Sequence, residues 1–354
     1  MSKEQKKKVV VLATGGTIAG VGDAGENLGY RSGQLSVESL LASVGNLLDS
    51  ANVELLSEQV CNVNSDDMTG EIWLSLARRV NELQDDSSVD GVVITHGTDT
   101  MDETAYFLNL TVCGSKPVVI TGSMRPATAK EPDGPRNLAD AIKVAAAGGV
   151  CSLSNDSITS SPSSAEGRCA KNCVLVCFGG FVYGASSVQK LSASALNPMG
   201  IHYAGEGSIA SAEHFEKSFA MGSGAGRSAS LRFDISNVKN LPQVNVLYFA
   251  VDADPQLLEF AGKISDGLVI AGAGSGEFSL KWSSTLSAIQ IPVVVASPIG
   301  QGLVTLNEDL APRGFAAGKL PPQKAAVLLR LALTKTKDPA ELRRIFEIAN
   351  AELH

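Results

Sequence analysis

The chain has 354 residues, 44% of them hydrophobic, which is long enough for two domains with sizeable buried cores. Its formal net charge is −8 and its only basic block is the short KEQKKK segment near the start, so we expect neither nucleic acid nor an anionic membrane as the main partner. No apolar segment of signal-peptide length precedes the first predicted strand, and no run of 18 apolar residues occurs. We therefore expect a cytoplasmic protein with a small polar substrate.

The first half of the chain alternates apolar runs with amphipathic stretches. Strands are predicted at 9–13, 92–95, 117–121 and 174–178, and helices near 69–84, 100–112 and 136–148. Continuous runs of Val, Ile and Leu between helices are typical of parallel strands that are covered on both faces. The pattern predicts an α/β fold whose larger N-terminal domain contains a doubly wound, mostly parallel sheet.

Two segments without periodicity interrupt this order. Residues 152–168 are rich in serine and poor in apolar residues, which favours an exposed insertion. We place a linker at 226–243, between an N-terminal domain at 1–225 and a smaller C-terminal domain at 244–354. The second domain again reads as a parallel α/β fold, with strands at 244–249, 267–272 and 292–297 and helices near 255–262, 279–289, 321–334 and 338–352.

The even spacing of Cys169, Cys173 and Cys177 is compatible with a metal or cluster site. The segment that carries them reads as a strand, however, on which residues four apart lie about 13 Å from each other, too far for one ion. Since the chain has only four histidines, we expect reduced core thiols and no metal site. A nucleophile in this chain then needs a base other than histidine, unless His96 serves.

Polar turns follow three predicted strands of the first domain. TGGT at 14–17 follows the first of them, HGTD at 96–99 the second and GSMRP at 122–126 the third. Ligands of open α/β sheets bind beyond the carboxyl ends of the strands, so these turns should meet at one site. Their hydroxyls, amides and single carboxylate favour a small polar ligand.

GVGDAG at 20–25 matches the spacing of a dinucleotide-binding fingerprint. That motif works only in the first turn between a strand and a helix. Here it begins seven residues after the apolar run at 9–13 ends, and the residues that follow do not open a helix. We attribute the match to a glycine-rich chain and expect no organic cofactor.

Thr17 admits two interpretations. A hydroxyl beside glycines can attack a carbonyl that lies close to backbone N–H groups, or TGGT can simply be a tight turn. Thr100 and Glu103 form a capping-box pattern, which places Thr98 and Asp99 at the N-terminal mouth of a helix. Asp99 there can merely stabilise the helix dipole. Two turns of hydroxyls and glycines at adjacent strand ends exceed what capping requires, which favours catalysis.

The chain resembles the bacterial-type L-asparaginases of the asparaginase/glutaminase family, most closely their type II branch. The likeness covers most of the chain in the expected order. It rests on LATGGTIAG (12–20), GVVITHGTDTMDETAYFLNLTV (91–112), GSMRP (122–126), DGPRNL (133–138) and PQKAAVLLRLALT (322–334).

This resemblance implies a catalytic role for five residues. Thr17 would be the primary nucleophile, and Tyr30, on a mobile lid, would orient and activate it. Thr98, Asp99 and a lysine would form the second catalytic group, for which Lys190 is the candidate. A lysine that takes up a proton near neutral pH needs partial burial to depress its pKa. The alternative is that Lys190 is an ordinary surface lysine.

The resemblance also implies how an amino-acid substrate is bound. Ser65 would hold its α-carboxylate, Asp66 would be the adjacent binding residue, and Asp99 would receive its α-ammonium, which matches the charges of a zwitterion. Asp66 departs from the family, where glutamine is familiar, and adds a negative charge. Ser123 is a further candidate for substrate binding.

The C-terminal domain departs from the family pattern more strongly. In this family it contributes to a neighbouring subunit's site, and Ser275 stands where an asparagine is often found. The expected glutamate maps to either Asn307 or Glu308. These departures leave Thr17 in place but leave the substrate preference open.

We therefore expect a cytoplasmic L-asparaginase that converts L-asparagine and water into L-aspartate and ammonia, without metal or cofactor. The alternatives are a glutaminase-asparaginase of broader specificity and a binding module that senses an amino acid without turnover. A relative that deamidates glutamine on aminoacyl-tRNA is disfavoured by the acidic charge. The resemblance further implies a homotetramer, a dimer of dimers with sites between subunits.

Overall fold

The computed structural model describes residues 6–22, 33–48, 51–147, 174–201, 210–211, 231–304 and 314–353. The chain separates into two compact units, Met1–Ile201 with Ser208–Arg232 and His202–Gly207 with Phe233–His354. The predicted linker at 226–243 overlaps the boundary after Arg232, and the domain bounds given above stay predictions. The Ser-rich insertion at 152–168 lies outside the described residues.

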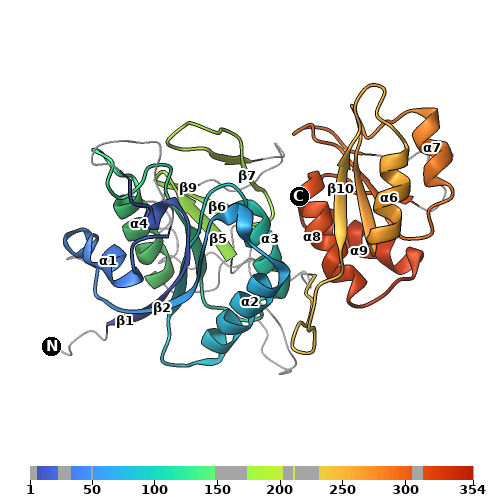
Figure 1. Cartoon of the computed structure of the whole chain (residues 1–354). Helices are drawn as coiled ribbons and strands as arrows, with labels where there is room; N and C mark the ends of the chain where they lie inside the picture. Colours follow the sequence, from blue (N-terminus) through green and yellow to red (C-terminus); the bar gives the residue numbers. More distant parts are fainter. Residues whose placement is uncertain are drawn as a thin grey trace. The chain divides into compact units, whose positions relative to one another are not determined.

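A seven-stranded sheet forms the centre of the first unit, in the order β2-β1-β3-β4-β5-β6-β9 (Figure 1). Its strands are β1 (Lys7–Gly15), β2 (Val53–Val63), β3 (Gly91–Thr95), β4 (Val118–Thr121), β5 (Val174–Phe178), β6 (Phe181–Gly184) and β9 (Ala210–Ser211). The strands from β2 to β5 in this order run parallel, whereas β6 and β9 are each antiparallel to the strand before them. The carboxyl ends of β2, β1 and β3 therefore lie side by side along the same side of the sheet, where the strands end.

The predicted strands form because their apolar runs are buried on both faces. Every residue of β3 and of β4 is buried. β2 was not predicted, because it is an edge strand in which half-buried and exposed positions mix and no continuous apolar run marks it.

Helices cover both faces of this sheet (Figure 1). They are α1 (Val37–Ala42), α2 (Gly70–Asp85), α3 (Met101–Thr111) and α4 (Gly134–Ala146). α1 and α4 share one core with alternate residues of β1, including Val9 and Val11. On the other face α2 packs on α3, where the rings of Trp73 and Phe107 stack at 5.0 Å. The predicted doubly wound α/β architecture is confirmed.

The second unit is smaller and contains a parallel sheet in the order β10-β11-β12-β13. Its elements are β10 (Val244–Tyr248), α6 (Gln256–Ile264), β11 (Gly267–Ala271), α7 (Leu280–Leu286), β12 (Val293–Ala296), β13 (Gly314–Ala316), α8 (Pro322–Leu333) and α9 (Pro339–Ala351). Trp282 anchors its core, fully buried, with its Nε1–H donating to the carbonyl of Ala253 at 2.9 Å. None of the described helices in either unit is long and apolar enough to cross a membrane.

Candidate active site

The turn after β1 brings Thr17 to the carboxyl edge of the large sheet. Gly15 and Gly16 have φ of +106° and +80°, which disfavours any residue with a side chain. A Cβ on Gly16 would lie 2.5 Å from the backbone nitrogen of Gly97, so the turn after β1 touches the turn after β3. Thr17 then begins a short 3₁₀ turn, closed by the N–H of Gly20 donating to the Thr17 carbonyl at 2.8 Å.

Ser65, in the turn that follows β2, lies next to the turns after β1 and β3. A Cβ on Gly97 would lie 2.8 Å from Ser65 Oγ. That hydroxyl accepts from the N–H of Asp99 at 3.2 Å, and the Ser65 carbonyl accepts from Thr100 Oγ1 at 2.6 Å. The strand order β2-β1-β3 thus places Ser65, Thr17 and Thr98 around one point.

The predicted capping box at the start of α3 is wrong in one respect. Thr100 is the N-cap residue, but its side chain accepts no capping hydrogen bond. Its backbone has φ −124° and ψ 20°, away from the extended conformation that an N-cap residue normally adopts. The hydroxyl is turned toward Ser65 and joins two strand ends instead.

Lys190 reaches this point from a separate antiparallel pair formed by β7 (Val188–Lys190) and β8 (Met199–Ile201). Its Nζ donates to Thr98 Oγ1 at 2.8 Å and to Asp99 Oδ1 at 2.6 Å. The Lys190 side chain is only 15% exposed, whereas that of Asp99 is 67% exposed. Lys190 therefore differs from a solvated surface lysine, because its ammonium is held by a buried hydroxyl and a carboxylate at the rim.

His96 lies next to the site, where its buried ring forms hydrogen bonds within the protein. It is fully buried, and burial lowers its pKa to about 4, so the ring is neutral. Its Nδ1 lies 2.7 Å from the carbonyl of Gly97, which can only accept, so Nδ1 carries the proton. Its Nε2 then accepts from Thr104 Oγ1 at 3.0 Å, and that hydroxyl accepts from Trp73 Nε1 at 2.9 Å. This series of hydrogen bonds holds the Gly97 carbonyl in place, and the buried His96 ring has no access to a substrate.

A polar hollow of about 250 Å³, here called the Thr17 hollow, opens where these turns meet. It is lined by Gly16, Thr17, Asn64, Ser65, Asp66, Gly97, Thr98 and Asp99. Asp66 and Asp99 are both exposed at its rim, and Lys190 supplies one positive charge beside them. The hollow can therefore take a small ligand that carries an ammonium group and hydrogen-bonding groups.

Two residues of the site, Asn64 and Met124, were not predicted from the sequence. Asn64 lines the hollow directly before Ser65, and its position next to that predicted serine is the signal that could have found it. Met124 Sδ accepts from Thr98 Oγ1 at 3.5 Å, so the turn after β4 reaches the site through a thioether.

Among the other predicted site residues, Ser123 is the one that the structure describes in the same unit as the Thr17 hollow. Ser123 is 1% exposed, does not line the Thr17 hollow, and donates its hydroxyl proton to the carbonyl of Arg125 at 2.8 Å. Ser275 is exposed in the second unit. Tyr30, Asn307 and Glu308 lie outside the described residues.

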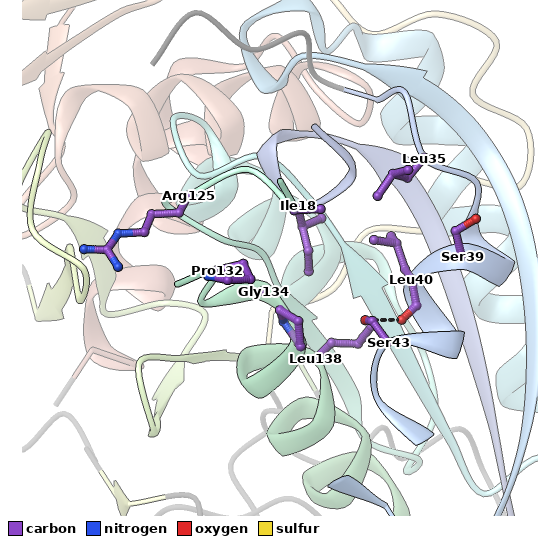
Figure 2. Close-up of a pocket in the computed structure, with 11 residues that line it drawn as sticks. Ile18, Leu35, Ser39, Leu40, Ser43, Arg125, Pro132, Gly134 and Leu138 are labelled. Atoms are coloured by element: carbon purple, nitrogen blue, oxygen red, sulfur yellow. Dashed lines mark hydrogen bonds between the residues drawn. The ribbon is translucent and has the colours of Figure 1, made fainter. Parts of the chain in front are cut away.

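A second, apolar cavity of about 70 Å³ lies behind the Thr17 turn (Figure 2). Figure 2 shows Ile18 between side chains from α1 and α4, while Arg125 extends away from the space. A Cβ on Gly134 would lie 2.9 Å from Ile18 Cγ1, so the residue after Thr17 is packed tightly on the start of α4. The cavity is too small and apolar for an amino acid, and its walls hold the turn in place.

No group of three or more metal-binding side chains occurs within the part of the chain that the structure describes. Cys177 is fully buried in β5, as expected of a core thiol, and burial raises its pKa. Cys169 and Cys173 lie outside the described residues.

Two family models match the chain. Residues 8–214 match the family described as "Asparaginase, N-terminal", and residues 243–346 match "Glutaminase/Asparaginase C-terminal domain". Together they span both compact units.

Full-length relatives agree with these matches. The chain is 37% identical to a protein of Haemophilus influenzae named "Probable L-asparaginase periplasmic", covering 96% of this chain and 92% of that one. It is 35% identical to the "Glutaminase-asparaginase" of Pseudomonas fluorescens biotype A, covering 98% and 91%. The solved structure of a probable cytoplasmic L-asparaginase from Campylobacter jejuni superposes with a TM-score of 0.79 at 32% identity, covering 97% and 99%. The chain therefore belongs to the bacterial-type L-asparaginase family.

Proposed function

We propose that this protein is an amidohydrolase that converts L-asparagine and water into L-aspartate and ammonia, with Thr17 as the nucleophile. The observation that carries the proposal is that Thr17 and Thr98 line one polar hollow, and that Lys190 is hydrogen-bonded to Thr98. A weak hydroxyl nucleophile needs proton-handling groups nearby, and this pair is the candidate.

The reaction would proceed through an ester of Thr17. The Thr17 hydroxyl oxygen attacks the side-chain amide carbon, its proton passes to the leaving nitrogen, and ammonia departs. Water then attacks the ester, which releases L-aspartate and restores the hydroxyl. We assign the proton transfers to Thr98 and Lys190, and the orientation of Thr17 to Tyr30 on the resemblance alone.

The lining of the hollow supports recognition of a zwitterion. Ser65 Oγ accepts from the Asp99 N–H, so its own proton can be donated to the α-carboxylate of a substrate. The carboxylates of Asp66 and Asp99 can both face the α-ammonium. Among the described residues Lys190 offsets one of these two charges, so the hollow favours a ligand with a localised positive charge.

A glutaminase-asparaginase is the second candidate, favoured by the name of the Pseudomonas relative. One methylene separates the two substrates, and a pocket discriminates one methylene by only about 1–3 kcal/mol. The hollow of about 250 Å³ does not decide between them.

Ammonia release from L-asparagine and from L-glutamine tests both candidates. We expect a higher kcat/KM for L-asparagine; equal values would favour the glutaminase-asparaginase. A protein that binds either amino acid, with a raised Tm, but releases no ammonia would be a binding module and would refute the proposed function.

We further propose that the protein acts as a homotetramer whose sites lie between subunits. Exposed apolar side chains on α6 support an association face in the second unit: Leu257, Phe260 and Ile264 are 53%, 64% and 53% exposed. They recur along one face of the helix. Light scattering should give a tetramer, and Phe260→Asp should dissociate it and lower the activity. A monomer with full activity would refute this arrangement.

We propose a cytoplasmic location, in line with the name of the Campylobacter protein, although the Haemophilus relative is named periplasmic. Cell fractionation against cytoplasmic and periplasmic markers decides between the two.

A further inference from the structure

Met124 has an unusual place in the site, because a sulfur atom is the hydrogen-bond acceptor of a buried threonine. Thr98 Oγ1 accepts from Lys190 Nζ at 2.8 Å and donates to Met124 Sδ at 3.5 Å. A thioether is a weak acceptor. The Thr98 proton is therefore directed away from Lys190, while the oxygen lone pair faces the ammonium.

The backbone of Met124 is held firmly while its side chain is only half-buried. Its N–H donates to Asp133 Oδ2 at 2.9 Å, and the N–H of Arg125 donates to Asp133 Oδ1 at 2.9 Å. Asn137 Nδ2 in turn donates to Asp133 Oδ2 at 3.2 Å and to the Gly122 carbonyl at 3.0 Å. Met124 is thus a half-buried residue on a turn whose backbone is anchored by hydrogen bonds to Asp133.

We propose that Met124 is an oxidation-sensitive modification site, at which conversion of the thioether to a sulfoxide switches off the Thr98–Lys190 pair. The inference rests on the proposed function, which assigns proton transfer to that pair. Met124 acts in it as a positioning residue, since it directs the Thr98 hydroxyl and does not touch a substrate.

The oxidant we name is hydrogen peroxide. The sulfur lone pair attacks one peroxide oxygen, the O–O bond breaks, the S–O bond forms, and water leaves with both protons. Sulfur loses two electrons and the peroxide gains them. Methionine sulfoxide reductase reverses the step, whereas a small thiol reductant does not remove the oxygen at a useful rate.

The sulfoxide changes both partners of Thr98. Its oxygen is a strong acceptor where sulfur was a weak one, so it holds the Thr98 proton and competes for the Lys190 ammonium. Because the backbone of the turn after β4 is fixed through Asp133, the added oxygen must be accommodated next to Thr98. We expect turnover to fall by about tenfold or more.

The test treats the full-length protein with dilute hydrogen peroxide, then with dithiothreitol, because the partly exposed Cys61 and the exposed Cys113 also oxidise. Peptide mass spectrometry measures the oxygen gained at each methionine. Ammonia release from L-asparagine should fall in proportion to Met124 sulfoxide, and methionine sulfoxide reductase should restore the mass and the rate together.

Two variants separate Met124 from other targets. After peroxide treatment, Met124→Leu should release ammonia at the same rate as before treatment. Met68→Leu is the matched control, because Met68 is also half-buried, whereas the sulfur that accepts from Thr98 belongs to Met124. This variant should lose activity as the wild type does. The proposal is overturned if Met124 is fully oxidised without loss of rate, if Met124→Leu is inactivated equally, or if Met68 oxidises while Met124 does not.

The same samples are titrated with L-aspartate while Tm is followed, so that failure of the proposed function is seen separately. An untreated protein that releases no ammonia refutes that function. If that happens, oxidation of Met124 should still reduce the rise in Tm that L-aspartate causes. In that case, an equal rise in Tm in oxidised and untreated protein, or no rise in either, overturns the role of Met124.

Discussion

Lys190 Nζ lies 2.8 Å from Thr98 Oγ1 although the two residues are 92 positions apart in the chain. The contact is made possible by the short β7–β8 pair, which carries Lys190 to the carboxyl edge of the large sheet. The ammonium also contacts Asp99 Oδ1 at 2.6 Å. A charge held between a buried hydroxyl and an exposed carboxylate can serve in proton transfer or in structure, and substitutions distinguish the two.

Lys190→Met should lower kcat for L-asparagine by about a hundredfold or more, because it removes the group that exchanges protons with Thr98. KM should change less, since Lys190 does not line the Thr17 hollow. Lys190→Arg is the control: it keeps the positive charge next to Asp99 but cannot deprotonate. Steady-state kinetics of both variants make the comparison, and a rate restored by arginine would show that only the charge matters.

Gly16→Ala should disrupt both stability and activity, since the new Cβ would meet the Gly97 nitrogen at 2.5 Å. We expect a loss in the free energy of unfolding of about 3 kcal/mol or more from strain and overlap together. Gly180→Ala is a matched control, because Gly180 has a similar φ of +82° with nothing within 4 Å of its Cβ position.

Gly180→Ala should therefore cost only about 1–2 kcal/mol, the strain of a left-handed residue, and should keep its activity. Urea unfolding and ammonia release measure both effects. Equal losses in the two variants would contradict the close packing of the turns after β1 and β3.

His96 should make the folded state sensitive to acid. Its pKa is lowered from 6.5 to about 4 by burial, so the unfolded chain binds the proton at higher pH than the folded one. The stability is fully present above pH 6.5 and falls as the pH drops toward 4, by about 3 kcal/mol in all. His96→Asn keeps a donor for the Gly97 carbonyl but does not titrate.

Urea unfolding at pH 7.5 and pH 4.5 should thus show a smaller pH dependence for His96→Asn than for the wild type. An identical dependence in both proteins would mean that His96 is already protonated in the folded state or exposed to solvent.

Asp66→Gln should weaken discrimination against the product. L-Aspartate carries a carboxylate where L-asparagine has an amide, and Asp66 adds negative charge to the hollow. Removing it should lower the ratio of the L-aspartate inhibition constant to the L-asparagine KM by about two- to fivefold, the scale of an exposed charge pair. Asp67→Asn is the control, since Asp67 lies in the same 3₁₀ turn but does not line the hollow. The same shift in Asp67→Asn would indicate a general field effect.

Much of the fold could be predicted from sequence because the parallel strands are buried on both faces. The runs that became β3 and β4 are continuous in apolar residues, and their polar turns follow at the carboxyl ends as expected. β2 and α1 were missed for physical reasons: β2 is a half-exposed edge strand, and α1 has only six residues.

The site was harder to predict where it depends on contacts distant in sequence. Thr17 and Thr98 could be grouped because their strands are neighbours in a parallel sheet. Lys190 was named only from resemblance, since no periodicity reveals where a three-residue strand such as β7 will place a side chain. Met124 belongs to the turn at 122–126 that was expected at the site, but nothing marked its side chain, because a methionine in a turn normally indicates packing.

The central claim is that Thr17, and not the other threonine of TGGT, attacks the substrate. Thr14 is 2% exposed and donates its hydroxyl proton to the Thr95 carbonyl at 2.8 Å, so its role is structural. The most direct test compares ammonia release from L-asparagine by Thr17→Ala and Thr14→Ala. We predict that Thr17→Ala loses about a thousandfold or more in turnover, while folded Thr14→Ala keeps most of it despite a stability loss of about 1 kcal/mol. Full turnover by Thr17→Ala would contradict the account.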